Sequence, residues 1–199
     1  MTTVRWLGLD PGDGGVDERH VEHRVLDLLD GLGLTADLVC THTVDGPVRT
    51  AASARLTGRT GDVLSEVGLV AALRAQWEGA AVLDDGPDGA AVELGPAAFR
   101  AGARAAVAQA RDGLAGRVVR FPGQDALRLD LPVGDVALVS AVEAVVAAVG
   151  DVTGDTVLRT SGYLRPRFEA GRLLLAVRPG PDSTVVPVER EQVHACAGH

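Results

Sequence analysis

Residues 4–15, VRWLGLDPGDGG, are the stretch around which the chain is organised. An apolar run ends in an Asp-Pro turn, three glycines follow, and a helical pattern begins directly afterwards, which predicts a strand, a loop and a helix. In an open α/β sheet, ligands bind beyond the carboxyl ends of the strands, where glycine N–H groups and a helix N-terminus approach them. We therefore expect a ligand-accessible bend after Leu9, with Gly12 and Gly14 as candidate ligand-binding residues.

The same loop carries carboxylates that could do chemistry. Asp10, Asp13 and Glu18 follow one another closely, and hard cations such as magnesium bind several carboxylate oxygens. One of the three could also act as a general base, so they are our candidate catalytic residues. The alternative, which we favour, is that they cap the turn and the helix that follows it.

Two resemblances cover this loop. Residues 9–15 resemble the first metal-binding loop of zinc-dependent N-acetylmuramoyl-alanine amidases, whose pattern is D-P-G-H-G-G. The resemblance implies zinc, with Asp13 in the place of the ligating histidine and Glu18 or Glu22 as the glutamate, although that family's later histidine and glutamate motifs are not found. Residues 7–12 also resemble the opening strand of RuvC-type resolvases, which implies a magnesium ligand at Asp10.

Composition argues against several classes of ligand. The glycines form no G-x-G-x-x-G pattern, and the chain contains no lysine, which excludes a P-loop and a Schiff-base mechanism. A formal charge of −8 and an aromatic content of 3% argue against a nucleic-acid partner. The chain also lacks isoleucine and asparagine, which together with the missing lysine indicates a high-GC bacterial genome.

Length and hydrophobicity set the expected organisation. With 199 residues, 46% of them apolar, the chain can bury one full core, and we expect a single domain over 1–199. The hydrophobic period changes from 3.6 to 2 near 150–155, which leaves a subdomain boundary open there. No basic segment followed by an apolar one opens the chain, so we expect a cytoplasmic protein. The longest apolar stretch, 136–149, is shorter than the roughly 20 residues of a membrane span, and we interpret it as a core helix.

The pattern of elements predicts a mixed α/β fold, with about four helices packed on a mixed sheet and a C-terminal antiparallel meander. Helices are expected over 17–32, 62–76, 95–113 and 135–149. Strands are expected over 37–44, 117–121 and 126–131, in a hairpin of 80–83 with 90–94, and in a meander over 157–164, 172–177 and 184–188.

Residues 45–61 read as a long polar connection between a strand and a helix. Arg49 and Arg55 in this segment could clamp a phosphate or carboxylate through bidentate hydrogen bonds, and we count them as candidate ligand-binding residues. A solvated connection is the alternative that we favour.

Histidine and cysteine fall in short clusters, two of which suggest a metal site. If the C-terminal tail folds back over the first strands, a thiolate and imidazole site for zinc, nickel or copper could form. The alternatives are a buried thiol beside a hydrogen-bonded imidazole, and a frayed tail. The candidate metal ligands are Cys40, His42, His194, Cys196 and His199.

Two functions follow from these observations. The first, which we favour, is a non-catalytic intracellular accessory or assembly protein that binds a partner protein, a second copy or a small ligand. The second is a metal-dependent hydrolase that uses the loop at Asp10 and Asp13 or the cysteine and histidine set. We expect no nucleic-acid and no membrane partner, and the sequence names no substrate.

Overall fold

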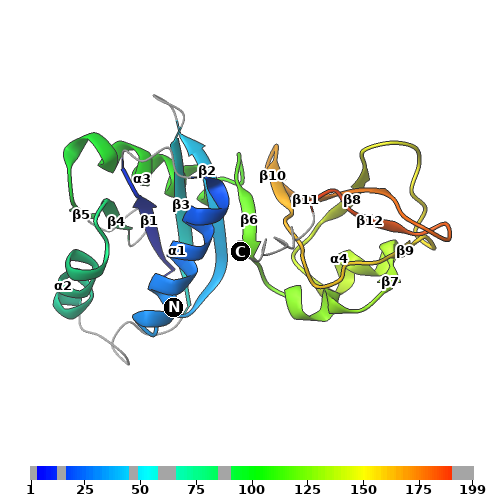
Figure 1. Cartoon of the computed structure of the whole chain (residues 1–199), viewed down its shortest axis with the longest axis horizontal. Coiled ribbons are helices and arrows are strands. Elements are labelled where there is room, and N and C mark those ends of the chain that lie inside the picture. The colour runs from blue at the N-terminus through cyan, green and yellow to red at the C-terminus, as the bar shows by residue number, and fades with distance from the viewer. Residues whose placement is uncertain (1–3, 13–16, 45–48, 58–65, 85–90, 190–199) are drawn as a thin grey trace, which may run out of the picture. The chain divides into compact units, whose positions relative to one another are not determined.

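The computed structural model describes residues 4–12, 17–44, 49–57, 66–84 and 91–189. Within them the chain has the predicted mixed α/β fold, with four α-helices and twelve strands that pair mostly antiparallel. The chain forms two compact units, which are described separately below (Figure 1). Unit 1 comprises Met1–Pro122 and Phe168–Arg172, and unit 2 comprises Gly123–Arg167 and Leu173–His199. The chain first passes from one unit to the other at Gly123, ahead of the change of period near 150–155.

Unit 1 begins with a β-α-β-β-α-β order: β1 (Arg5–Asp10), α1 (Glu18–Gly31), β2 (Ala36–Val44), β3 (Arg49–Leu56), α2 (Glu66–Gln76) and β4 (Ala80–Asp84). Its strands lie in the order β4-β1-β3-β2, so that β3 separates β1 from β2 in a split βαβ arrangement. β5 (Val92–Leu94) adds to β4, and β6 (Arg117–Arg120) adds to β2. All these pairs are antiparallel, and β1 lies inside the sheet.

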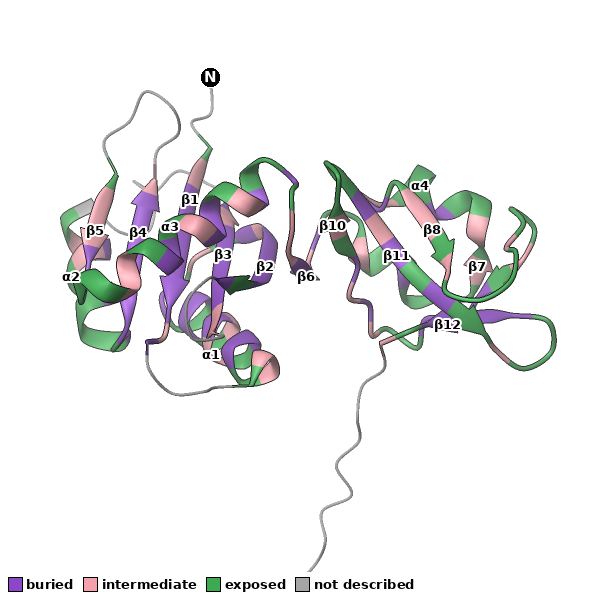
Figure 2. Ribbon diagram, turned by 90° about the horizontal axis from the view of Figure 1, so that it is seen from above, coloured by how far each residue is buried: buried purple, intermediate pink, exposed green. Residues whose placement is uncertain are grey.

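Helices α1 and α2 cover one face of this sheet (Figure 2). α1 begins after Asp17, whose carboxylate accepts a hydrogen bond from the Arg19 N–H, as expected of a helix cap. Its apolar residues at helical spacing, Val21, Val25, Leu28 and Leu29, are buried. The core on this face includes Leu7, Leu9, Val21, Val25, Leu29, Ala52, Ala54, Leu69, Leu73 and Trp77.

Helix α3 (Ala97–Arg111) covers the opposite face and lies very close to the strands. A Cβ atom placed on Gly8 of β1 would lie 2.2 Å from the carbonyl oxygen of Ala103, so the two backbones touch there. Elsewhere in this contact, Ala51 and Val44 pack with Ala106 of α3. Small side chains therefore set the distance between helix and sheet.

The prediction of a polar connection over 45–61 is wrong where the structure describes it, because 49–56 form the buried strand β3. Its run of Ala51, Ala52, Ser53 and Ala54 is fully buried between the two helical layers. Small residues such as alanine and serine do not favour a strand, so the sequence pattern gives no sign of one here. The buried position of this strand nevertheless requires small side chains. The predicted start of the next helix, at 62, lies outside the described residues; α2 is described from Glu66.

Unit 2 is built of short strands and turns. It contains η1 (Gln124–Arg128), β7 (Leu131–Pro132), η2 (Val133–Asp135), α4 (Val136–Val139), β8 (Ala144–Ala147), β9 (Val157–Leu158), most of β11 (Arg172–Pro179) and β12 (Val185–Pro187). The pairing order is β8-β11-β12-β9-β7, with β8·β11 and β9·β12 parallel and the other two pairs antiparallel. β10 (Arg167–Glu169) belongs mainly to unit 1, where the Phe168 N–H donates to the Gly116 carbonyl at 3.0 Å.

The predicted core helix over 135–149 is wrong, because helix α4 ends after one turn and β8 follows it. The hydroxyl of Ser140 donates to the Val136 carbonyl at 2.8 Å and accepts the Val142 N–H at 3.2 Å, which ends the helix. The valines that follow suit a strand, and β8 pairs with β11. Within the described chain, no helix combines the length and the apolar character needed to cross a membrane.

Two further predictions for unit 2 differ from the structure. The first half of the strand expected over 126–131 belongs to the 3₁₀ helix η1, in which the Leu127 carbonyl accepts a hydrogen bond from the Thr160 hydroxyl. The meander is confirmed for the antiparallel pair β11·β12, whereas 157–164 contributes only β9, which runs parallel to β12. The hairpin of β4 and β5 is as predicted.

We expect Gly8→Ala to lower the free energy of unfolding by about 3 kcal/mol, because the added methyl group must push α3 away from β1. Gly31→Ala is the matched control, since a Cβ there would meet only the side-chain oxygen of Gln76, at 3.7 Å, and should change stability by less than about 1 kcal/mol. Urea unfolding of both variants measures the difference. Equal stabilities would contradict the close approach of α3.

Candidate functional site

Asp10, the strongest candidate in the sequence, ends β1 and is fully buried. Its Oδ1 accepts the Gly12 N–H at 2.9 Å, and its Oδ2 lies 3.3 Å from Nη2 of Arg49 at the start of β3. The Arg49 guanidinium in turn lies over the Phe99 ring, 5.2 Å from its centroid. The side chain of Arg49 is only 13% exposed, so carboxylate and guanidinium form a buried ion pair.

Glycines make room for this ion pair. A Cβ on Gly102 of α3 would lie 2.0 Å from Oδ2 of Asp10, and a Cβ on Gly79 would lie 1.9 Å from the Asp10 carbonyl oxygen. The Phe99 ring covers Gly12 in the same way, with Cε2 2.8 Å from a Cβ there. The bend after β1 is therefore filled by α3 and by the residues before β4, and Asp10 serves to join strands.

Cys40 and His42 lie beside each other on the face of β2 that α3 covers, in a second polar group. His42 Nε2 lies 2.8 Å from the Ser53 hydroxyl, and its Nδ1 lies 3.1 Å from Oε1 of Gln109 on α3. Burial lowers the pKa of His42 to about 4, and it raises the pKa of the Cys40 thiol to about 12. Both groups are therefore neutral at physiological pH, which corresponds to the buried thiol beside a hydrogen-bonded imidazole.

A third polar group joins α1 to the opposite face of the sheet. Arg117 Nη1 donates to Oε2 of Glu22 at 2.8 Å, and both side chains are at most 5% exposed. The Thr41 hydroxyl donates to Oε1 of Glu18 at 2.7 Å. Thr41 lies between Cys40 and His42 in β2, so its side chain faces away from α3. The side chain of Asp10 lies beneath α3. Glu18 and Asp10 are therefore on opposite faces of the sheet.

The structure separates most of the predicted site residues. Arg55 donates from Nε and Nη2 to the two carboxylate oxygens of Asp37 at 2.7 and 2.9 Å, and it does not join Arg49. The described residues contain no group of three His, Cys, Asp or Glu side chains that could hold a metal ion. The remaining candidates lie outside the described residues: Asp13, Gly14, His194, Cys196 and His199.

Sequence reasoning missed the partners of these groups. Ser53 falls in the segment expected to be a connection, and Gln109 lies on a helix in which no sequence pattern marks it as a partner of His42. The pair of Glu22 and Arg117 is separated by 95 positions, and no local pattern connects the two residues.

Unit 2 shows a different kind of surface. Ten large apolar side chains among the described residues are exposed; three of them lie in unit 1 and seven in unit 2. The seven are Leu129, Leu138, Val139, Val146, Val149, Val157 and Val188. Leu138 and Val139 belong to α4, Val146 belongs to β8, and Val149 follows β8 by two residues. Helix α4 contacts β8. Among the described strands, β8 pairs only with β11, so no described strand covers its second edge.

We expect Arg49→Met to lower the free energy of unfolding by about 3 kcal/mol, because it leaves the Asp10 carboxylate buried without its cation. Arg55→Met is the matched control, since Arg55 and Asp37 are each 34% exposed and their separation should cost less than about 1 kcal/mol. Chemical denaturation at neutral pH gives both values. Similar losses for the two variants would show that Asp10 does not depend on Arg49.

Acidification should destabilise unit 1 through His42. Its pKa is about 4 in the folded chain and 6.5 when unperturbed, so the unfolded chain takes up a proton first as the pH falls. The stabilisation that comes from keeping His42 neutral is fully present above pH 6.5 and is lost as the pH falls towards 4. The loss in the free energy of unfolding is about 2 kcal/mol at pH 5. Unfolding of the wild type and of His42→Gln at pH 7.5 and pH 5 measures this loss, which the variant should lack. Parallel losses in both proteins would exclude His42 as the source.

Comparison of the chain with protein-family models, with curated protein sequences and with solved structures gives no match. The function of the chain is therefore inferred from its own residues. Seven of the ten exposed large apolar side chains of the described residues lie in unit 2.

Proposed function

We propose that the chain is a non-catalytic accessory or assembly protein that binds another protein through unit 2. The observation that carries this proposal is β8, an uncharged strand of Ala-Val-Val-Ala that lacks a described strand on its second edge. Val146 in β8 is 44% exposed, and Val149 just beyond it is 71% exposed. Exposed apolar surface beside an open strand edge is typical of a protein interaction site.

The sequence around β8 supports this proposal. Soluble proteins usually protect an edge strand with lysine, another charge or proline, and residues 144–150 contain none of these. Glu143, the charged residue before the strand, bonds to the backbone of Leu173: its N–H donates to the Leu173 carbonyl at 2.8 Å, and its Oε1 accepts the Leu173 N–H at 3.1 Å. An extended segment added to β8 would form main-chain hydrogen bonds and would cover the neighbouring valines.

Unit 1 also supports an accessory role over the metal-dependent hydrolase. Asp10 is paired with Arg49, and Glu18 lies across the sheet from it. His42 is 1% exposed and bonds to Ser53 and Gln109. These groups hold the strands and helices of unit 1 together.

We expect Val146→Lys to abolish partner binding, because it places a charge in the middle of the open edge. Val67→Lys is the matched control, since Val67 is 79% exposed on α2 of unit 1. Tagged wild type and both variants are purified from cells that naturally express the chain, and sedimentation measures self-association of the untagged proteins. The wild type and Val67→Lys should capture a partner protein or form a dimer. Val146→Lys should reduce the amount of captured partner or of dimer at least tenfold.

The proposal is overturned if all three proteins are monomers and retain the same set of proteins. Circular dichroism and urea unfolding of the variants establish that each remains folded. If only the dimer responds to Val146→Lys, the partner is a second copy of the chain, and the role in assembly stands.

A further inference from the structure

The two faces of β8 differ in what they cover. Val145 lies opposite Leu175 of β11, which is almost fully buried, whereas Val146 lies opposite the exposed Ala176. Residues that lie opposite each other in neighbouring strands place their side chains on the same face, and successive residues alternate between the faces. Val145 and Ala147 therefore lie on the core face of the sheet, and Val146 lies on its solvent face. None of the residues of β8 is buried (Figure 2).

The pairing of β8 with β11 also decides which backbone groups point to the second edge. Just beyond the strand, the Ala148 N–H donates to a carbonyl of β11 at 2.8 Å. Along a strand, successive residues direct their N–H and C=O groups to opposite edges. Val146, two residues before Ala148, therefore bonds to β11, and Val145 and Ala147 direct their N–H and C=O groups to the second edge. Glu143, whose N–H also points to β11, precedes the strand, where this alternation is interrupted.

A second copy of the same strand matches these groups in a register that uses all of them. When Val145 lies opposite Ala147 of an antiparallel copy, and Ala147 opposite Val145, each pair exchanges both of its N–H···O=C bonds. This arrangement is symmetric, so Val146 lies opposite Val146 of the copy on a twofold axis. The central pair is not hydrogen-bonded, and the Cα atoms of such pairs are only about 4.5 Å apart. Two valines that are each 44% exposed in the single chain thereby cover each other.

The charges near β8 permit this pairing. Residues 144–150 carry no charge, and the register places Glu143 of one copy opposite Val149 of the other. Like charges that lie directly opposite each other in neighbouring strands destabilise a sheet. The register avoids such a contact at this edge, although each chain has a formal charge of −8.

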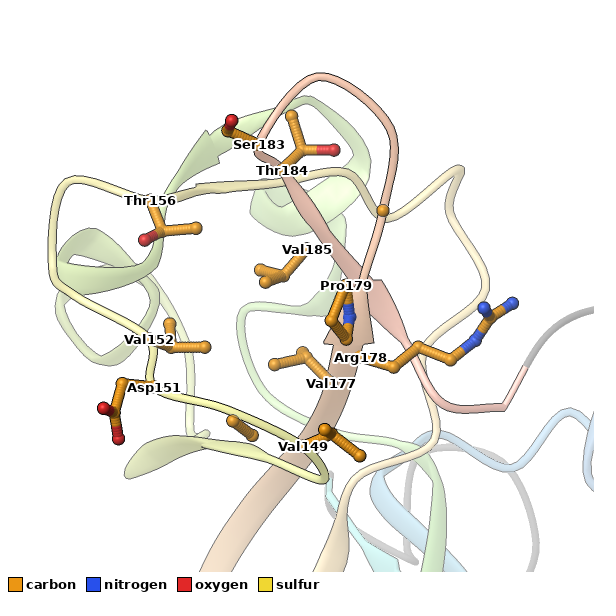
Figure 3. Close-up of a pocket in the computed structure, with 12 residues that line it drawn as sticks. Val149, Asp151, Val152, Thr156, Val177, Arg178, Pro179, Ser183, Thr184 and Val185 are labelled. Atoms are coloured by element: carbon orange, nitrogen blue, oxygen red, sulfur yellow. The ribbon is translucent and has the colours of Figure 1, made fainter.

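A second copy also suits this edge better than an unstructured segment does. Its β8 is already ordered within a folded unit, so the pairing requires little loss of conformational freedom. It presents the same uncharged edge by symmetry, whereas another protein must supply an equivalent edge of its own. The cavity of about 200 Å³ beside β8 takes no part, because it lies over β11 and β12 on the side of β8 that is already paired (Figure 3).

We propose that two copies of the chain pair their β8 strands antiparallel, with Val146 on the twofold axis. The inference rests on the proposed function and names the partner as a second copy. The pairing joins the two unit 2 sheets into one and removes an unprotected edge from each copy.

Opposite charges at Val146 test this register. In Val146→Lys and in Val146→Glu, two like charges meet at the axis, so each variant alone should dimerise at least about tenfold more weakly than the wild type. An equimolar mixture brings lysine opposite glutamate and should dimerise about fivefold or more tightly than either variant alone. Sedimentation equilibrium of the full chain gives the dissociation constants.

Val188→Lys and Val188→Glu are the matched controls. Val188 is 43% exposed, and its N–H donates to Ala176 on the β12 side of β11. Each control should keep the dissociation constant of the dimer within twofold of the wild type, and mixing the two should change nothing.

A disulfide tests the distance at the axis. In a Cys196→Ser background the remaining native cysteine is Cys40, which is buried. Val146→Cys in this background should form a disulfide-linked dimer on mild oxidation, because Cα atoms about 4.5 Å apart lie within the range that a disulfide spans. Val188→Cys should stay unlinked, because several strand spacings of about 4.8 Å separate its two copies. Non-reducing electrophoresis measures both.

The outcomes separate the two proposals. Self-pairing is overturned if the wild type sediments as a monomer, or if the mixture of Val146→Lys and Val146→Glu dimerises no better than either variant alone. A dimer that Val146→Cys does not cross-link also overturns it. In each case, capture of a different protein that Val146→Lys abolishes upholds the proposed function. If there is neither a dimer nor a captured partner, both proposals fail.

Discussion

The contact of α3 with β1 is the constraint on which unit 1 depends. Gly8 lets the strand backbone touch the helix at Ala103, and Gly102 lets the Asp10 carboxylate fit beneath the helix. A layer this thin leaves little room for large side chains, and the residues of β3 on this face, Ala51 and Ser53, are small. Polar groups that enter such a layer must find their partners within the protein, since burial without a hydrogen bond is costly.

The internal polar groups each join elements that apolar packing alone would hold loosely. Glu22 of α1 meets Arg117 of β6, and Gln109 of α3 meets His42 of β2. An apolar contact changes little when a helix slides along a sheet, whereas a hydrogen bond between named atoms is lost within about an ångström. The two helical layers are thereby fixed in register against the strands.

Much of unit 1 could be predicted from the sequence, because its helices carry a clear apolar stripe and its first strand ends in an unmistakable turn. β3 could not, since small residues carry no strand pattern, and β8 could not, since alanine and valine at 144–149 suit a helix as well as a strand. The described candidate residues could not be grouped from the sequence either. Asp10 and Glu18 are close in sequence but lie on opposite faces of an antiparallel sheet, so the rule for the open ends of parallel strands does not apply.

The chain leaves unit 2 after Arg167, contributes residues 168–172 to unit 1, and returns. Unit 1 is therefore not complete when its first 122 residues have been synthesised, because the carbonyl groups of Gly113 and Gly116 accept from Gly171 and Phe168. During synthesis on the ribosome, β6 lacks its neighbour β10 until residues 123–167 of unit 2 have been made. The order of synthesis thus couples the maturation of the two units, and a break in the chain near 123 would deprive unit 1 of a segment that it needs.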